Sequence, residues 1–123
     1  MEEVLRRYLQ ALESGRYENL LELFSADAVV KSPLYGTVKA ADFYRNLLNI
    51  TDRSTITLLN LFVSSTESNV AAAQFRYQWV LRNNMPVDFE CVDVFEFTDR
   101  GEIQQLTIIY DTCQARPLFE RVY

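Results

Sequence analysis

Residues 88–97 read DFECVDVFEF, and this stretch decides the fold. As a β-strand it sends alternate side chains to opposite faces of a sheet. One face then carries Phe89, Cys91, Asp93, Phe95 and Phe97, so it is apolar except for a single acid in its middle. A carboxyl group among aromatic rings is costly unless something compensates for it. The pattern therefore predicts a strand whose inner face contributes Asp93 to a ligand pocket.

Length and charge limit the classes of protein that the chain can represent. It has 123 residues, a formal net charge of −5 and 49% hydrophobic residues. This length predicts a single domain, residues 1–123, with a core large enough to fold without disulfides or metals. The acidic balance and the lack of a dense basic run argue against nucleic acid or an anionic membrane as the partner. No apolar run reaches membrane-spanning length and the N-terminal segment is strongly charged, which predicts a cytoplasmic protein.

The chain contains no histidine, which removes several kinds of catalytic site. Ser–His and Cys–His nucleophile pairs, histidine acid–base catalysis and most catalytic zinc sites need that residue. The two cysteines, Cys91 and Cys113, lack the spacing of a metal or redox motif. We therefore expect reduced thiols, no metal and no cofactor.

The apolar periodicity divides the chain into a helical part and a strand-rich part. Helical spacing covers residues 3–14, 17–24 and 39–48, with a short β-rich segment at 28–31. From residue 54 onward the pattern indicates long strands at 55–63, 70–81, 88–97 and 102–111. Helices followed by hairpin-connected strands indicate an α+β fold. We expect a cone: a strongly curved antiparallel sheet wrapped around the N-terminal helices and enclosing a pocket.

These segments, in this order, resemble the nuclear-transport-factor-2-like or SnoaL-like superfamily, and within it bacterial ketosteroid isomerase. The stretch RRYLQALESGRYENLLELFSADAVV is similar to the opening helices and first strand, and ADFYRNLL to the third helix. FRYQWV, DFECVDVFEF and GEIQQLTIIYD are similar to the family's sheet. The resemblance covers nearly the whole chain and implies the cone fold. It implies no single function, because the superfamily mixes isomerases, dehydratases, cyclases, hydrolases and inert binders.

The resemblance also implies an oxygen-binding pair. Tyr8 falls at the oxyanion-hole tyrosine of the isomerases, Asp93 at the acid beside it, and Tyr44 at a tyrosine that supports the first. Ser32 stands where the isomerases carry their general-base aspartate, and a serine without a histidine cannot abstract a carbon-bound proton. The candidate ligand-binding residues match positions that line or support the family's cavity, lie at its expected mouth, or, as Phe43, face inward on the third helix: Phe24, Tyr35, Phe43, Tyr44, Phe75, Tyr77, Phe89, Cys91, Phe95, Leu106, Ile108 and Tyr110.

Three functions stay open at this point. A carboxyl group surrounded by rings should have a raised pKa, so a neutral Asp93 and Tyr8 would both donate hydrogen bonds to one oxygen of a small apolar molecule. The first hypothesis is an isomerase or lyase acting on a carbonyl compound, and the second is a binding module that sequesters an aromatic ligand. The third is an interaction protein with a vestigial cavity, in which Asp93 is a structural acid bonded to Tyr8 or to backbone amides. The absent base favours binding or weak catalysis, and whether the protein is an enzyme stays open.

The outward strand faces predict a homodimer. Val92, Val94 and Ile109 share these faces with glutamines and Thr107, a mixture more apolar than fully solvated strands carry. Members of the resembled family commonly pair through the sheet. We therefore expect two copies of this chain to associate through it.

Overall fold

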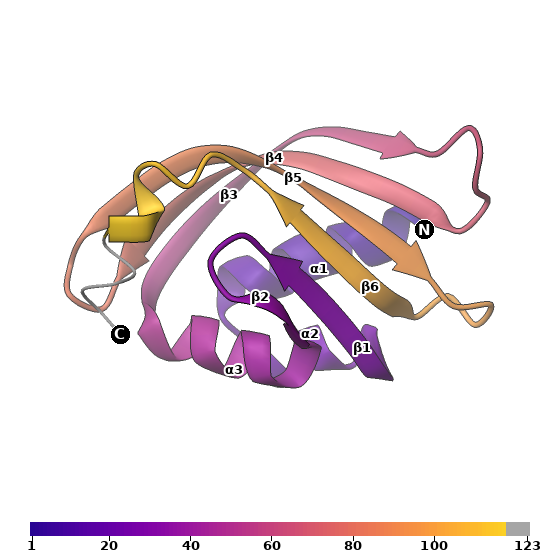
Figure 1. Cartoon of the computed structure of the whole chain (residues 1–123), viewed down its shortest axis with the longest axis horizontal. Coiled ribbons are helices and arrows are strands. Elements are labelled where there is room, and N and C mark those ends of the chain that lie inside the picture. The colour runs from indigo at the N-terminus through magenta and orange to yellow at the C-terminus, as the bar shows by residue number, and fades with distance from the viewer. Residues whose placement is uncertain (118–123) are drawn as a thin grey trace.

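The computed structural model describes residues 1–117 and shows a curved sheet that arches over three helices (Figure 1). The elements in chain order are α1 (Glu2–Ser14), α2 (Tyr17–Leu21), β1 (Phe24–Ser32), β2 (Gly36–Lys39), α3 (Ala40–Ile50), β3 (Thr51–Val63), β4 (Val70–Leu81), β5 (Pro86–Phe97) and β6 (Ile103–Ile109). The six strands lie in the order β2-β1-β6-β5-β4-β3, and the sheet does not close on itself. The predicted α+β fold with a strongly curved sheet is confirmed.

Strand β5, which contains the DFECVDVFEF stretch, lies inside the sheet between β4 and β6. The register places Asp93 opposite Ala73 of β4 and Ile108 of β6. Cys91, Asp93, Phe95 and Phe97 are all buried, as the period of two predicts. Neighbouring strands are antiparallel except for β1 and β6, which run parallel with Val30 opposite Leu106.

The segment around β1 and β2 differs from the sequence prediction. Helix α2 ends at Leu21, although helical spacing continues to residue 24. Phe24 instead begins β1, because it pairs with Ile103 of β6, whose N–H donates to the carbonyl of Leu23. Strand β2 lies where the sequence predicts a turn and the start of a helix. Pairing with β1 draws residues 36–39 into the sheet, so tertiary contacts override the local pattern.

Helix α1 packs its apolar stripe into the concave side of the sheet. Leu5, Tyr8, Leu9 and Leu12 recur at helical spacing and are buried, and the helix ends at Gly15, which takes the left-handed conformation (φ 69°). On the polar side of α1, the Glu13 carboxylate accepts the backbone N–H of Ile56 in the edge strand β3 at 2.7 Å. This bond satisfies an edge amide and fixes the helix against the sheet.

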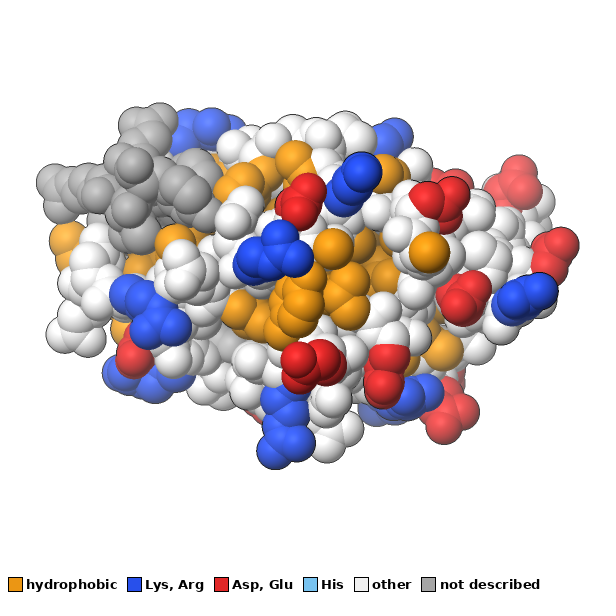
Figure 2. Space-filling model, turned by 90° about the horizontal axis from the view of Figure 1, so that it is seen from below, with side chains coloured by type: hydrophobic (Ala, Val, Ile, Leu, Met, Phe, Trp, Pro, Cys, Tyr) orange, Lys and Arg blue, Asp and Glu red, His pale blue; other side chains and the backbone are white. Residues whose placement is uncertain are grey.

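The face seen from below carries hydrophobic side chains in its middle, with acidic and basic side chains around them (Figure 2). Such a mixed surface is ordinary for a globular domain. Within residues 1–117 no helix has both the length and the hydropathy needed to cross a membrane.

Candidate functional site

A cavity lies between helices α1 and α3, the β1–β2 turn and the inner face of the sheet. Its volume is about 50 Å³, or about 490 Å³ when all unfilled space out to the mouth is included. Within the part of the chain that the structure describes, the wall contains no lysine or arginine, and Asp93 is its single carboxyl group. The cavity is therefore apolar with one acid in its wall.

Asp93 is the most unusual group in this wall. Its side chain is 2% exposed, and Oδ1 has no hydrogen-bond partner among the described residues. Burial raises the pKa of Asp93 to about 8, and a hydrogen bond from the Tyr8 hydroxyl acts against this rise. At neutral pH the carboxyl group is therefore mostly protonated, so it can donate as well as accept a hydrogen bond.

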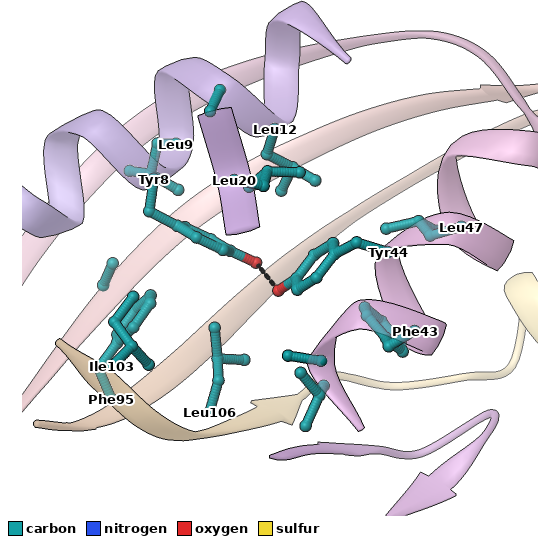
Figure 3. Packing of buried hydrophobic residues seen from close by; sticks show 14 of the residues in the cluster. Tyr8, Leu9, Leu12, Leu20, Phe43, Tyr44, Leu47, Phe95, Ile103 and Leu106 are labelled. Atoms are coloured by element: carbon teal, nitrogen blue, oxygen red, sulfur yellow. Dashed lines mark hydrogen bonds between the residues drawn. The ribbon is translucent and has the colours of Figure 1, made fainter. Parts of the chain in front are cut away.

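Tyr8 of α1 and Tyr44 of α3 point toward one another and share a hydrogen bond, with 2.6 Å between the two hydroxyl oxygens (Figure 3). Burial raises the pKa of both phenols well above the ordinary value, so both keep their protons. Each phenol has one proton to donate. When Tyr44 donates to Tyr8, the proton of Tyr8 is free to reach Asp93 or a ligand oxygen.

Aromatic packing fixes the orientation of Tyr8. Its ring meets those of Phe24, Tyr44 and Phe95 edge to face, with centroid separations of 6.2, 6.1 and 5.1 Å. Edge-to-face contacts of this kind stabilise one ring orientation beyond simple burial. The Tyr8 hydroxyl is therefore held at the cavity wall by residues that lie behind it.

Ser32 has a structural task at the mouth of the cavity. Its Oγ accepts the backbone N–H groups of Leu34 and Tyr35, at 3.1 and 3.3 Å. These bonds shape the turn between β1 and β2 and occupy the lone pairs that a base would need. Ser32 lines the cavity as a turn residue whose oxygen is already engaged.

Three other ionisable groups in the wall are neutral. Burial raises the pKa of Cys91, Tyr77 and Tyr110, so the thiol and both phenols stay protonated. A buried, protonated thiol is a poor nucleophile. Within residues 1–117, no three histidine, cysteine, aspartate or glutamate side chains lie close enough together to hold a metal ion.

The structure divides the sequence-predicted residues into two groups. Those that line the cavity are Tyr8, Ser32, Tyr35, Phe43, Phe75, Tyr77, Phe89, Cys91, Asp93, Ile108 and Tyr110. Those that lie in the hydrophobic core outside the cavity wall are Phe24, Tyr44, Phe95 and Leu106. The core position of Tyr44 agrees with a supporting task, because it reaches the cavity through Tyr8.

Sequence reasoning left four wall residues out of the site: Leu12, Leu34, Leu47 and Trp79. Leu12 lies one helical turn after Tyr8, so the same helical stripe could have pointed to it. Trp79 shares the inner face of β4 with Phe75 and Tyr77. Its indole N–H donates to Thr51 Oγ1 at 2.8 Å, which holds the ring against the end of α3.

Comparison with known proteins identifies the family. A family model described as a SnoaL-like domain matches residues 5–106. The chain belongs to the SnoaL-like domain family. Among solved structures, Δ5-3-ketosteroid isomerase from Mycobacterium sp. has a TM-score of 0.75 and 20% identity, covering 89% of this chain and 92% of that chain.

Two further structures extend the range of proteins similar to this SnoaL-like domain. One is SalBIII, an epoxide hydrolase/cyclase-like enzyme with a role in pyran ring formation in the polyether salinomycin. It has a TM-score of 0.76 and 18% identity, covering 89% of each chain. An NTF2-like protein of unknown function from Burkholderia pseudomallei has a TM-score of 0.80 and 16% identity, covering 95% of each chain. At these identities the likeness concerns the fold, which isomerases and cyclase-like enzymes share.

Proposed function

We propose that this SnoaL-like domain binds a small, neutral, apolar or aromatic molecule in its cavity, with Asp93 and Tyr8 holding one ligand oxygen. The observation that carries the proposal is the buried Oδ1 of Asp93, which has no partner among the described residues. A buried polar atom without a hydrogen bond costs roughly 1–3 kcal/mol. A carbonyl or hydroxyl oxygen placed beside it removes that cost, so the cavity favours ligands that carry one.

The charge of the wall supports a neutral ligand. An anion entering the cavity would lose its hydration, and within residues 1–117 no wall lysine or arginine would compensate for the loss. Ligand sites for drug-sized molecules have volumes of roughly 300–1,000 Å³, far above the roughly 50 Å³ of this cavity. A compound of one or two rings therefore suits the site better than a four-ring steroid.

Weak isomerase or lyase activity on a carbonyl compound is the second candidate, and the pKa of Asp93 favours it. A general acid or base works best when its pKa lies near the working pH, and about 8 meets this condition. In this proposal Asp93 gives a proton to the ligand oxygen while a water molecule takes one from the α-carbon, and Tyr8 holds the resulting enol by a hydrogen bond. The water then returns its proton at the γ-carbon, and the enol proton goes back to Asp93. A β,γ-unsaturated cyclohexenone is a suitable probe, because its conversion to the conjugated isomer is seen by ultraviolet absorbance.

The binding experiment uses Trp79 as its reporter, since it is the only tryptophan in the chain and lines the cavity. A naphthol is titrated at neutral pH, and methylnaphthalene, similar in size but without the oxygen, serves as the control ligand. Asp93→Leu and Tyr8→Phe should each weaken naphthol binding by about 1–3 kcal/mol. Tyr17→Phe, on helix α2 outside the cavity wall, should leave it unchanged.

Three outcomes would contradict this proposal. Equal affinity for naphthol and methylnaphthalene would mean that no group in the cavity recognises the oxygen. Unchanged naphthol affinity in both Asp93→Leu and Tyr8→Phe would mean that this pair does not hold it. A wild-type protein that binds neither compound would favour the interaction module with a vestigial cavity.

A further inference from the structure

The chain that follows β6 crosses from the sheet to the turn between β1 and β2. Nη2 of Arg116 donates a hydrogen bond to the carbonyl oxygen of Pro33 at 2.6 Å. The preceding residue, Ala115, is 1% exposed, so the segment is packed down at this point. Figure 1 shows its short helix at the end of the molecule opposite the N-terminus.

One end of this crossing is a residue of the cavity wall, and the other end contacts a residue whose two neighbours line it. Pro33 lies between Ser32 and Leu34, which line the cavity. Tyr110, where the crossing begins, also lines it, and its ring stacks on Phe89 with 4.1 Å between centroids and 13° between planes. The segment therefore runs from a wall residue on the sheet side to the turn that carries Ser32 and Leu34.

Local hydrogen bonds give the segment a defined shape. The N–H of Cys113 donates to the Asp111 carboxylate at 2.9 Å, and the N–H of Arg116 donates to the carbonyl of Thr112 at 2.9 Å. Burial raises the pKa of Tyr110, and the positive charge of Arg116 opposes that rise, as expected for a guanidinium group near the mouth. The folded segment thus carries Arg116 to Pro33.

We propose that residues 110–116 form a latch on the cavity, in which the bond from Arg116 to Pro33 holds the β1–β2 turn against the sheet and its release opens the cavity. This inference concerns access to the ligand site, so its biological purpose rests on the proposed binding function. The latch contacts the β1–β2 turn through the exposed side chain of Arg116, whereas Ala115 and the stacked ring of Tyr110 hold its other parts against the fold. Water competes for an exposed bond, so it breaks and forms readily.

The size of the cavity requires such a movement. About 50 Å³ is room for a few water molecules at most, and an aromatic ring needs more. Moving Tyr110 off Phe89 together with the β1–β2 turn enlarges the cavity without breaking the sheet, because Tyr110 lies just after the last residue of β6. The latch therefore lies where opening disturbs the fold least.

Acrylamide quenching of Trp79 tests the latch without any ligand. Trp79 is 2% exposed and lines the cavity, so quencher reaches it mainly through an open mouth. Arg116→Gln removes the charge and should raise the open population, and with it the quenching constant, by roughly fivefold. Arg116→Lys keeps a charged donor and should lie between this variant and the wild type.

Arg100→Gln is the matched control, because it removes an exposed arginine in the β5–β6 turn. A second readout is the rate at which a small maleimide labels Cys91, a wall residue, in a Cys113→Ser background that lacks the exposed thiol. Arg116→Gln should raise this rate by a similar factor. Denaturation midpoints of all variants show whether a change reflects latch opening or general destabilisation.

The outcomes separate the latch from the binding proposal. If the Trp79 quenching constant and the Cys91 labelling rate of Arg116→Gln match those of the wild type and Arg100→Gln, the latch is refuted, whether or not naphthol binds. If both rise at an unchanged denaturation midpoint, the latch stands even when naphthol does not bind. If naphthol binds, both its association and its dissociation rate should rise in Arg116→Gln. Asp93→Leu should instead weaken naphthol binding while the quenching constant of Trp79 stays at the wild-type value.

Discussion

Replacing Asp93 by asparagine should change how the stability of the protein depends on pH. The folded protein holds the Asp93 proton up to a pKa of about 8, whereas in the unfolded chain the carboxyl group returns to its ordinary value of 3.8. Between these values the folded state binds more protons than the unfolded state. Stability contributed by this proton is thus fully present below pH 4 and is lost as the pH rises toward 8.

The size of the effect follows from the same two values. Each pH unit between them lowers the free energy of unfolding by about 1.4 kcal/mol, so the whole interval amounts to roughly 5–6 kcal/mol as an upper limit. That is a large share of the ~5–15 kcal/mol that stabilises a typical domain. The asparagine side chain in the variant keeps the shape of the neutral acid but has no acidic proton to lose.

Urea denaturation at pH 5, 6 and 7, followed by Trp79 fluorescence, measures the difference. With m near ~2 kcal/mol per molar urea, the wild-type midpoint should fall relative to Asp93→Asn by about 0.7 M per pH unit. Asp99→Asn makes the same change at an exposed turn and should leave the wild-type pH dependence intact. If the urea midpoints of the wild type and Asp93→Asn differ by the same amount at pH 5, 6 and 7, Asp93 is not held neutral. That result would remove the basis for its role as a hydrogen-bond donor.

Three further predictions concern the β1–β2 turn, the junction between α3 and β3, and the outer face of the sheet. Ser32→Ala leaves two amides of the β1–β2 turn without their acceptor and should lower the free energy of unfolding by about 1–2 kcal/mol in urea titrations. Thr51→Val removes the hydroxyl that accepts the Trp79 indole N–H and donates to a carbonyl of α3. The free energy of unfolding should therefore fall by roughly 1–3 kcal/mol, and the fluorescence emission of Trp79 should shift. Val94→Glu tests our proposal that two copies pair through the outer sheet face: sedimentation should show a wild-type dimer and a variant monomer, and a wild-type monomer at micromolar concentration would contradict it.

The strands that flank Asp93 could be predicted because their side chains alternate. The period of two in β5 depends only on the sequence, and it places the acid on the buried face, as the structure confirms. The sequence signal for strands β1 and β2 is weaker, because apolar and polar residues alternate little in them. These strands form through pairing with each other and, for β1, with β6. The predicted α2 boundary is wrong for the same reason, since Phe24 fits a helical stripe as well as a strand.

The cavity wall is harder to predict than the strands. Alternation shows which side chains point inward, but it cannot tell a wall residue from a core residue on the same face. Phe95 and Cys91 share one face of β5, yet Tyr8 covers Phe95 while Cys91 reaches the cavity. That distinction depends on where α1 and α3 lie over the sheet, which only the three-dimensional arrangement shows.

The parallel pairing of β1 with β6 has a consequence for how the chain folds. Val30 and Leu106 are opposite one another, although 76 positions separate them in the sequence. Contacts between distant positions slow folding, because a long loop must close before they form. During synthesis, β1 has to wait without its partner until residues 103–109 have left the ribosome. We therefore expect chains that stop before residue 103 to lack a stable fold and to depend on chaperones.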